Sequence, residues 1–282
     1  MRGTEKRENL PEEGERVRFQ EKILDFYKRN GRHDLLWRKT TDPYHILVSE
    51  VMLQQTQVPR VTVKYPRFIS EFPDVYSLAE ATLTKVLGAW KGMGYNRRAI
   101  VLRTIAGLVV DRFSGIIPDD EKILTGFPGI GKATAGAISA FAFNQPAVFI
   151  ETNIRRVFIH CFFGDQVPVS DGEIRPLVAS TLDREHPRVW YYALMDYGAV
   201  LRRRIPNPNR RSTHYYRQPA FEGSDRQIRG LVLELLLREG TISKKDLITH
   251  IGEQPERTEK ILEALAKEGF ITFGSDIICL HH

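Results

Sequence analysis

The stretch that decides the fold is residues 124–157, LTGFPGIGKATAGAISAFAFNQPAVFIETNIRRV. Its apolar lead turns through Phe-Pro-Gly-Ile-Gly at residues 127–131 and continues as a small-residue helix predicted over residues 132–143. Glycines reach dihedral angles that are closed to other residues, and they let a second backbone approach closely. The free N–H groups at the start of a helix suit a phosphate oxygen. With the short helix predicted at residues 119–125, this stretch indicates a helix, a hairpin and a second helix.

The glycine-rich turn has three competing interpretations. A nucleotide-binding P-loop needs Ser or Thr directly after its lysine, whereas Ala133 follows Lys132. A dinucleotide-binding turn needs a preceding strand within a βαβ unit, but the residues before this turn are predicted to be helical. The third interpretation is a tight turn without any ligand. Gly-Ile-Gly-Lys alone does not separate it from a phosphate site.

Two carboxylates are candidates for chemistry. Glu151 lies beyond the hairpin helix, between an apolar approach and a basic helical stretch at residues 153–156. A turn that binds phosphate, followed by an isolated carboxylate, is typical of an enzyme that binds the DNA backbone and attacks a nucleotide. Glu50 lies beside apolar positions on a predicted helix, residues 44–56, so it is a candidate for a raised pKa. A solvated helix carboxylate is the alternative for Glu50.

The composition narrows the classes of protein that fit. The 282 residues are 42% hydrophobic and 27% charged, which is ordinary for a soluble globular protein. The net charge of +6 permits a polyanionic partner. The sequence has no run of eighteen or so apolar residues and no signal-peptide core, so no membrane association is expected. Two distant cysteines, Cys161 and Cys279, make no disulfide framework. We expect an intracellular protein, cytoplasmic or nucleoid-associated.

The rest of the chain is predicted to be helical up to residue 201, after a solvated, flexible tail at residues 1–18. Gly94 and Tyr95, beside arginines, could place an aromatic ring and positive charge at a nucleic-acid groove. A core tyrosine is the alternative. The predicted helices outside the hairpin are residues 19–29, 44–56, 61–72, 84–90, 97–110, 171–182 and 188–201.

The composition changes after residue 201. Residues 202–223 are basic and rich in Pro and Asn, which fits either a linker or a loop against the DNA backbone. Residues 224–282 are predicted to form helices at 227–239, 244–251 and 256–269, followed by a two-stranded hairpin. This order is typical of a winged helix–turn–helix, a module that binds either DNA or protein.

Together the motifs resemble the helix–hairpin–helix DNA glycosylases of the endonuclease III type and, within them, the MutY-type adenine glycosylases. The likeness covers roughly residues 19–201, and its several motifs keep the family's order and spacing. The matching segments are residues 42–44 (DPY), 49–58 (SEVMLQQTQV), 92–95 (GMGY), 128–138 (PGIGKATAGAI), 153–157 (NIRRV) and 195–199 (MDYGA).

The resemblance implies a mainly α fold: a two-lobed helix–hairpin–helix DNA glycosylase domain plus a C-terminal winged helix–turn–helix. DNA would bind across the cleft with the target nucleotide flipped out. Glu50 matches the acid that protonates the departing base, and Glu151 falls where a carboxylate stabilises the oxocarbenium-like sugar or orients water. Asn153 belongs to the same expected catalytic set. The expected DNA-binding residues are Gln55, Gly94, Tyr95, Gly129, Gly131, Lys132, Thr134 and Arg155.

The chain departs from the family at several positions. The family has Asp where this chain has Glu151. Bifunctional members carry a Schiff-base lysine at the position of Ala133, so we expect a monofunctional enzyme without an AP-lyase lysine, in which Lys132 contacts a phosphate. The family's iron–sulfur cluster needs four thiolates, and no cysteine lies between Cys161 and Cys279. We therefore expect no iron–sulfur cluster and no other cofactor. The one exception is a monovalent cation, which could bind at the hairpin.

Two further departures affect substrate and architecture. The basic residues 202–217 lie where the cluster loop would be, and they could supply its positive charge without metal. MutY-type proteins usually end in a larger domain that reads 8-oxoguanine opposite the adenine, whereas this chain ends in a winged helix. Asn96 stands where those enzymes often have a second tyrosine.

The prediction is a monofunctional DNA glycosylase, acting as a monomer on double-stranded DNA that contains a damaged or mispaired base. Because the 8-oxoguanine reader is missing, the preferred substrates are uracil, 5-hydroxyuracil or thymine opposite guanine. One alternative is adenine opposite 8-oxoguanine, since Glu50 and Gln55 match. The other is a catalytically dead DNA-binding protein. The predicted domains are residues 19–201 (glycosylase), 202–223 (basic linker or loop) and 224–282 (winged helix).

Overall fold

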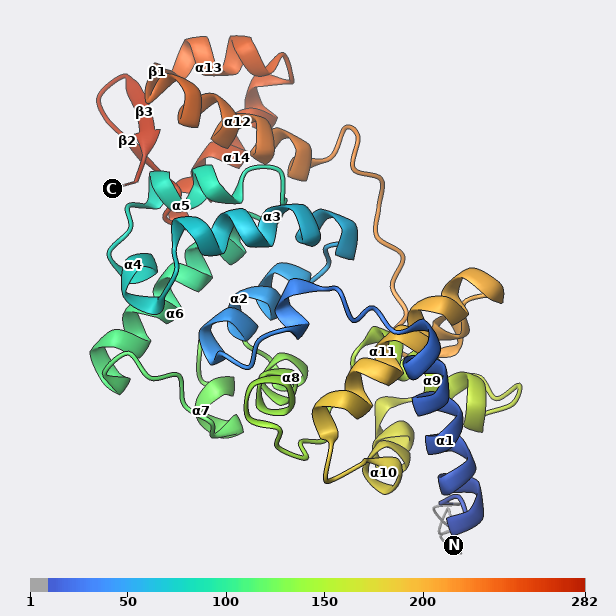
Figure 1. The fold of residues 1–282 in the computed structure, drawn as a ribbon. Helices are drawn as coiled ribbons and strands as arrows, with labels where there is room; N and C mark the ends of the chain where they lie inside the picture. The colour runs from blue at the N-terminus through green and yellow to red at the C-terminus, as the bar shows by residue number, and fades with distance from the viewer. Residues whose placement is uncertain (1–9, 282) are drawn as a thin grey trace, which may run out of the picture. The chain divides into compact units, whose positions relative to one another are not determined.

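The computed structural model describes residues 10–281 of the chain, which are mainly helical (Figure 1). They form two compact units, each built from segments that are distant in sequence. The first unit contains the described residues up to Ile46 together with Asp119–Gly126 and Ile130–Arg217. The second contains Leu47–Pro118, Phe127–Gly129 and the described residues from Gln218 onward. This division differs from the predicted consecutive domains, because the C-terminal region belongs to the same unit as Leu47–Pro118.

The first unit is entirely helical in its regular structure. Its core includes an aromatic cluster in which Phe19 meets Phe158, Phe162 and Trp190 edge to face, with ring centroids 5.0 to 5.8 Å apart. The helices are α1 (Glu13–Asn30), α7 (Glu121–Thr125), α8 (Lys132–Phe143), α9 (Thr152–Phe162), α10 (Asp171–Thr181) and α11 (Pro187–Arg204), with 3-10 turns η1 (Leu36–Arg38) and η2 (Pro208–Arg211).

The N-terminal prediction needs a correction. Helix α1 begins at Glu13, so residues 13–18 are helical and are not part of a flexible tail. Two acidic residues in the first turn, Glu13 and Glu15, favour this start because they complement the helix dipole. Residues 10–12 precede the helix, and residues 1–9 of the predicted tail lie outside the described residues.

Close helix packing in the first unit depends on two glycines. A Cβ added to Gly136 on α8 would come within 2.8 Å of the Cβ of Phe149. A Cβ added to Gly198 on α11 would come within 2.5 Å of the carbonyl oxygen of Asn153. Both distances are shorter than real contacts allow, so only glycine fits there. Gly198 thereby lets α11 lie directly against the start of α9, where Glu151 is located.

The second unit contains the remaining elements, and α2 (Pro43–Leu53) begins in the first unit and ends in the second. Its core includes Phe68, Phe72 and Trp90, all fully buried. Pro66 lies inside α3. The other elements are α3 (Val58–Glu71), α4 (Val75–Ala79), α5 (Leu83–Trp90), α6 (Arg97–Phe113), α12 (Asp225–Glu239), β1 (Thr241–Ser243), α13 (Lys244–Ile251), α14 (Pro255–Lys267), β2 (Ile271–Phe273) and β3 (Ile277–Leu280).

The C-terminal elements are compatible with the predicted winged helix, with one correction. The sheet has three antiparallel strands in the order β1-β3-β2, and not two, because Thr241–Ser243 pairs with β3. Three residues are too few to show a strand period, and Ser243 at their end caps α13, which is a helix-start signal. An ion pair of 2.8 Å between Lys91 Nζ and Glu234 Oε1 joins this module to the end of α5.

Candidate active site

Glu151 is the N-cap residue of α9. Its Oε1 accepts hydrogen bonds from the backbone N–H groups of Asn153 (2.6 Å) and Ile154 (2.8 Å), and its Oε2 accepts one from Asn153 Nδ2 (3.2 Å). Ser, Thr, Asp and Asn are the usual residues at this position. The longer Glu side chain folds back and fills the same role. The carboxylate therefore lies on the positive end of the helix dipole, which favours its anionic form.

Burial acts on the Glu151 carboxylate in the opposite direction. Desolvation raises the pKa of Glu151 above its ordinary value, while the N–H groups of Ile154 and Asn153 and the charges of Arg156 and Arg155 pull that pKa down. Burial is the largest of these influences, so the pKa stays raised. The result is a poorly solvated carboxylate in fixed hydrogen bonds, which is what electrostatic stabilisation of a developing cation requires.

Arg156 fixes the orientation of Asn153. Its Nη1 donates to Asn153 Oδ1 (2.6 Å) and to the Gly198 carbonyl oxygen (2.8 Å), and its Nε donates to Asn207 Oδ1 (3.1 Å). The guanidinium of Arg156 can only donate hydrogen bonds, so the amide oxygen of Asn153 must face Arg156. The amide nitrogen of Asn153 therefore faces the Glu151 carboxylate. A chain of hydrogen bonds thus runs from Asn207 through Arg156 and Asn153 to the Glu151 carboxylate.

The basic segment after α11 is part of this arrangement. Arg202, Arg203 and Arg204 complete α11, and the 3-10 turn η2 follows. Asn209 Nδ2 donates to the Thr152 carbonyl oxygen in the first turn of α9 (2.9 Å). Arg211 donates to carbonyl oxygens of Ile159 and Gly164. The stretch through η2 is therefore bound to α9 by its own hydrogen bonds and is not a free linker.

The residues present do not fit an iron–sulfur cluster. The chain has two cysteines, and a cluster held by thiolates needs four. Within residues 10–281, no group of three or more His, Cys, Asp and Glu side chains could hold a metal ion. Protein hydrogen bonds from η2 instead hold the polypeptide against α9 at the place where the resemblance puts the cluster loop.

Arg155 does not have the geometry expected of a phosphate ligand. Its Nε and Nη2 bind the two carboxylate oxygens of Asp171, both at 2.7 Å, and its side chain is 15% exposed. Burial by itself would raise the pKa of Asp171, but the hydrogen bonds and charge of Arg155 hold it below its ordinary value. A bidentate pair of this kind fixes α9 to the start of α10. The contact of Arg155 with DNA stays a prediction, and this ion pair is the role that the structure shows for Arg155.

The hairpin glycines have different local requirements. Gly129 has a φ of 71°, and a Cβ added there would come within 2.9 Å of Val101 Cγ1. Gly131 is the N-cap of α8, has no side-chain cap hydrogen bond, and would have open space around an added Cβ. Gly131 and Lys132 are exposed, and Thr134 is partly exposed. The first turn of α8 thus presents backbone N–H groups that no side chain at the N-cap covers, as an anion site requires.

Arg98 organises the predicted DNA-contact loops of the second unit, a role that the sequence analysis missed. It is 8% exposed, and burial lowers the pKa of its guanidinium to about 10. Its Nη2 donates to the Gly94 carbonyl oxygen (3.0 Å) and to Thr56 Oγ1 (2.9 Å). Its Nη1 donates to three carbonyl oxygens at the end of α2, those of Val51 (2.9 Å), Met52 (2.9 Å) and Gln54 (2.5 Å).

Gln55 and Tyr95 share an unusual backbone conformation. Their φ angles are 54° and 48°, which non-glycine residues seldom adopt and which often mark functional sites. Arg98 binds the backbone beside both, so it sustains these conformations. The Tyr95 hydroxyl meets Gln218 Nε2 and lies 3.4 Å from Arg226 Nη1. The predicted DNA-contact loop is therefore bonded to the segment that leads into the C-terminal module.

The predicted catalytic residues occupy two different units. Glu151 and Asn153 are in direct contact in the first unit. Glu50 is half-buried in the last turn of α2, in the second unit. Gln54 Nε2, four residues further along, donates to the Gly129 carbonyl oxygen of the hairpin (3.3 Å). The end of α2 thus contacts the hairpin directly.

Comparison with known proteins places these features in a family. Residues 48–175, which include Glu50, the hairpin and Glu151, match the HhH-GPD superfamily of base excision DNA repair proteins. An adenine DNA glycosylase from Mycobacterium tuberculosis is 32% identical over 274 residues, covering 89% of each chain. An adenine DNA glycosylase from Buchnera aphidicola is 35% identical over 187 residues, and the match spans 52% of its length.

The fold agrees with these sequence matches. A thermostable thymine-DNA glycosylase superposes with a TM-score of 0.59 and 26% identity, over 66% of this chain and 87% of that one. The chain belongs to the HhH-GPD superfamily of base excision DNA repair proteins, and the predicted mainly α, helix–hairpin–helix glycosylase fold is confirmed. By this membership it is a base excision DNA glycosylase. No helix within the described part of the chain is long and apolar enough to cross a membrane.

Proposed function

We propose that this protein is a monofunctional DNA glycosylase that removes adenine from a mispair, with 8-oxoguanine as the preferred opposite base. The observation that carries the proposal is the Glu151 carboxylate, desolvated and held by three hydrogen bonds at the start of α9. Such a group is suited to face a positive charge that develops on a deoxyribose ring.

The choice of base rests on the relatives. The sequence analysis led to the expectation that the excised base is a pyrimidine. The M. tuberculosis protein weakens that expectation, since it carries the name adenine DNA glycosylase and aligns with this chain over 89% of its length. Glu50, whose position matches the acid that protonates the departing adenine, points the same way.

The predicted catalytic residues and the hairpin have defined roles in the proposed reaction. The open N-terminus of α8 and Lys132 hold a phosphate while the target nucleotide turns out of the stack. Glu50 donates a proton to the base as the bond from C1′ to the base nitrogen breaks. Glu151, with Asn153 fixing its orientation, stabilises the positive sugar until a water oxygen adds to C1′ and releases its proton. The products are the free base and an abasic site.

The monofunctional assignment rests on Ala133. A lyase reaction needs an amine that attacks C1′ and forms a Schiff base. Ala133 is at the position where the family's bifunctional members have that lysine, and its neighbour Lys132 is exposed on the first turn of α8. We expect Lys132 to bind a phosphate. No cofactor takes part in the proposed reaction, and a monovalent cation at the hairpin stays a prediction.

A panel of duplexes tests the proposal. Each duplex carries one lesion pair: adenine opposite 8-oxoguanine, adenine opposite guanine, or uracil, 5-hydroxyuracil or thymine opposite guanine. Single-turnover rates are measured with and without alkali. We expect the fastest release from adenine opposite 8-oxoguanine, with strand cleavage only after alkali. Cleavage without alkali would overturn the monofunctional assignment.

A second candidate function has one specific observation in its favour. The thymine-DNA glycosylase that shares the fold is 26% identical to this chain. Faster release of thymine or uracil opposite guanine than of adenine would favour this candidate. Tight binding to a lesion duplex without release of any base would instead indicate a catalytically dead DNA-binding protein.

A further inference from the structure

The C-terminal module differs in charge from the rest of the chain. Residues 224–282 contain ten Asp and Glu and eight Lys and Arg residues, a net charge of −2. The whole chain carries +6, so residues 1–223 carry +8. A module that adds phosphate contacts to a DNA-binding protein is normally its basic part. This module is the acidic part.

The helix that a winged helix uses for DNA is unsuited to that use here. In such modules the second helix of the helix–turn–helix enters the major groove. The corresponding helix is α14, whose exposed positions include Glu256, Lys260, Glu263 and Lys267. Carboxylates at alternate exposed positions repel the phosphates that flank the groove, and the two lysines only offset them. The charge on α14 therefore disfavours a DNA partner.

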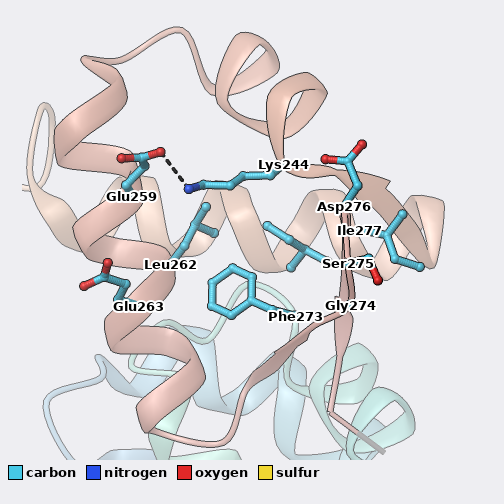
Figure 2. Close-up of a pocket in the computed structure, with 10 residues that line it drawn as sticks. Lys244, Glu259, Leu262, Glu263, Phe273, Gly274, Ser275, Asp276 and Ile277 are labelled. Atoms are coloured by element: carbon cyan, nitrogen blue, oxygen red, sulfur yellow. Dashed lines mark ion pairs between the residues drawn. The ribbon is translucent and has the colours of Figure 1, made fainter.

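A hollow of about 290 Å³ lies between α14 and the hairpin of β2 and β3 (Figure 2). We call it the wing pocket. Leu262 and Ile278, both fully buried, form its apolar floor. Figure 2 shows the ring of Phe273 turned toward Leu262, and Phe273 is still 43% exposed. A smaller apolar cavity of about 150 Å³ already accommodates benzene, so the wing pocket has room for a large apolar side chain.

The rim of the wing pocket is acidic. Glu259, Glu263 and Asp276 line it, together with Lys244 as its basic residue. Lys244 Nζ is 2.7 Å from Glu259 Oε1, so these two charges neutralise each other. Among residues 10–281 no ion pair engages Glu263 or Asp276, which are both exposed. An apolar floor with two available carboxylates on its rim is complementary to an apolar side chain flanked by positive charges.

We propose that the wing pocket is a docking site for a partner protein, and that it binds a basic segment that inserts one large apolar side chain beside Phe273. Glu263 and Asp276 pair with Lys or Arg residues on either side of that side chain. An exposed aromatic residue over an apolar floor is the usual centre of such an interface. The site is separate from the glycosylase residues, and the proposal does not depend on which base is excised.

The test uses the full chain and a displayed library of random twelve-residue peptides. We expect enriched peptides to share an aromatic residue or Leu flanked by Lys or Arg. Binding of a synthetic enriched peptide is then measured by fluorescence anisotropy. Phe273→Ala, and separately Glu263→Lys with Asp276→Lys, should each weaken binding at least tenfold. Leu231→Ala is the matched control, because Leu231 is also 43% exposed but lies outside the wing pocket; it should leave binding unchanged.

The outcomes that overturn the proposal are distinct. No shared pattern, or an acidic one, among the enriched peptides would contradict it. A loss of duplex-DNA affinity in Phe273→Ala, at an unchanged melting temperature, would make the module a DNA reader. Self-association of the wild type that Phe273→Ala abolishes, measured by sedimentation velocity, would make the occupant a second copy of this chain. Equal loss of peptide binding in Leu231→Ala would show that the binding is not specific to the wing pocket.

Discussion

The N-termini of α8 and α9 are close together in the sequence and differ in how their first backbone N–H groups are used. At α8 the N-cap is Gly131, which has no side chain to cover the first N–H groups. At α9 the N-cap is Glu151, whose carboxylate occupies them. In both cases the first backbone N–H groups have no acceptor within their own helix, and these groups together with the helix dipole attract an anion. We infer that the first N-terminus is left open for a phosphate of DNA, while the second holds the protein's own reactive anion in place.

The largest expected effect comes from removing the anion at α9. Glu151→Gln keeps the size and one acceptor oxygen but loses the charge. We expect the single-turnover rate of base release to fall about 1,000-fold, in line with the loss of one electrostatic stabiliser in other enzymes. Glu151→Asp introduces the aspartate that the family carries at this position, so it should retain more activity than Glu151→Gln. Full activity in Glu151→Gln would exclude the catalytic role.

Alanine substitutions of the two hairpin glycines should have different effects, one on the stability of the fold and the other on DNA binding. Gly129→Ala should lower the free energy of unfolding by about 1–3 kcal/mol, because φ is 71° and the new Cβ meets Val101. Gly131→Ala should leave the melting temperature unchanged, because the added Cβ meets nothing in the protein. It should weaken duplex binding about tenfold if a phosphate approaches there. Thermal melts and anisotropy titrations check both; equal stability of the two variants would contradict the assignment.

The positioning chain behind Glu151 should have a smaller effect. Asn207→Ala removes the acceptor for Arg156 Nε, 3.1 Å away. A hydrogen bond to a charged group contributes about 1.5–3 kcal/mol. Because Asn153 stays bonded to Arg156 Nη1, we expect only a fivefold to tenfold loss of kcat, about 1–1.4 kcal/mol and so less than that range, with KM unchanged. Asn209→Ala is the control for η2, since the Asn209 side chain bonds the Thr152 carbonyl oxygen, and the backbone N–H that Asn209 donates to Asn207 Oδ1 is kept in the variant. A change in KM alone would indicate a DNA contact.

The pH dependence of stability gives the smallest effect. Because burial raises the pKa of Glu151 in the folded state, protonation favours the folded protein. The wild type should therefore gain unfolding free energy relative to Glu151→Gln as the pH falls from that raised value to about 4.3, the ordinary value of Glu. Urea titrations of both proteins at several pH values measure the difference. A wild type that loses stability relative to the variant over this window would show that the folded-state pKa is lowered.

The sequence predicted those features that depend on local pattern. Helix α8 was predicted over its observed span, and Glu151 was singled out by its spacing from the hairpin. Features that depend on distant residues were missed. The bidentate pair of Arg155 with Asp171 was not foreseen, because Asp171 comes from another helix. Arg98 was not singled out, because most of its partners are backbone carbonyls, which leave no mark in the sequence.

The direction of the Glu151 side chain is the most instructive of these cases. Spacing identified the residue, but a Glu is not a usual N-cap, so the pattern gave no reason to expect its carboxylate on the α9 backbone. That arrangement depends on Asn153, whose amide is oriented by Arg156, and on Gly198, which lets α11 approach. Only the folded chain brings these residues together.

The most direct test of the central claim measures affinity and rate on one duplex for two variants. With adenine opposite 8-oxoguanine, Glu151→Gln should bind with wild-type affinity and release base about 1,000-fold more slowly. Gly131→Ala should bind about tenfold more weakly and release base at the wild-type rate once saturated. This crossed result would establish that the two N-termini divide binding and chemistry between them. Loss of both properties in either variant, or loss of neither, would contradict the account.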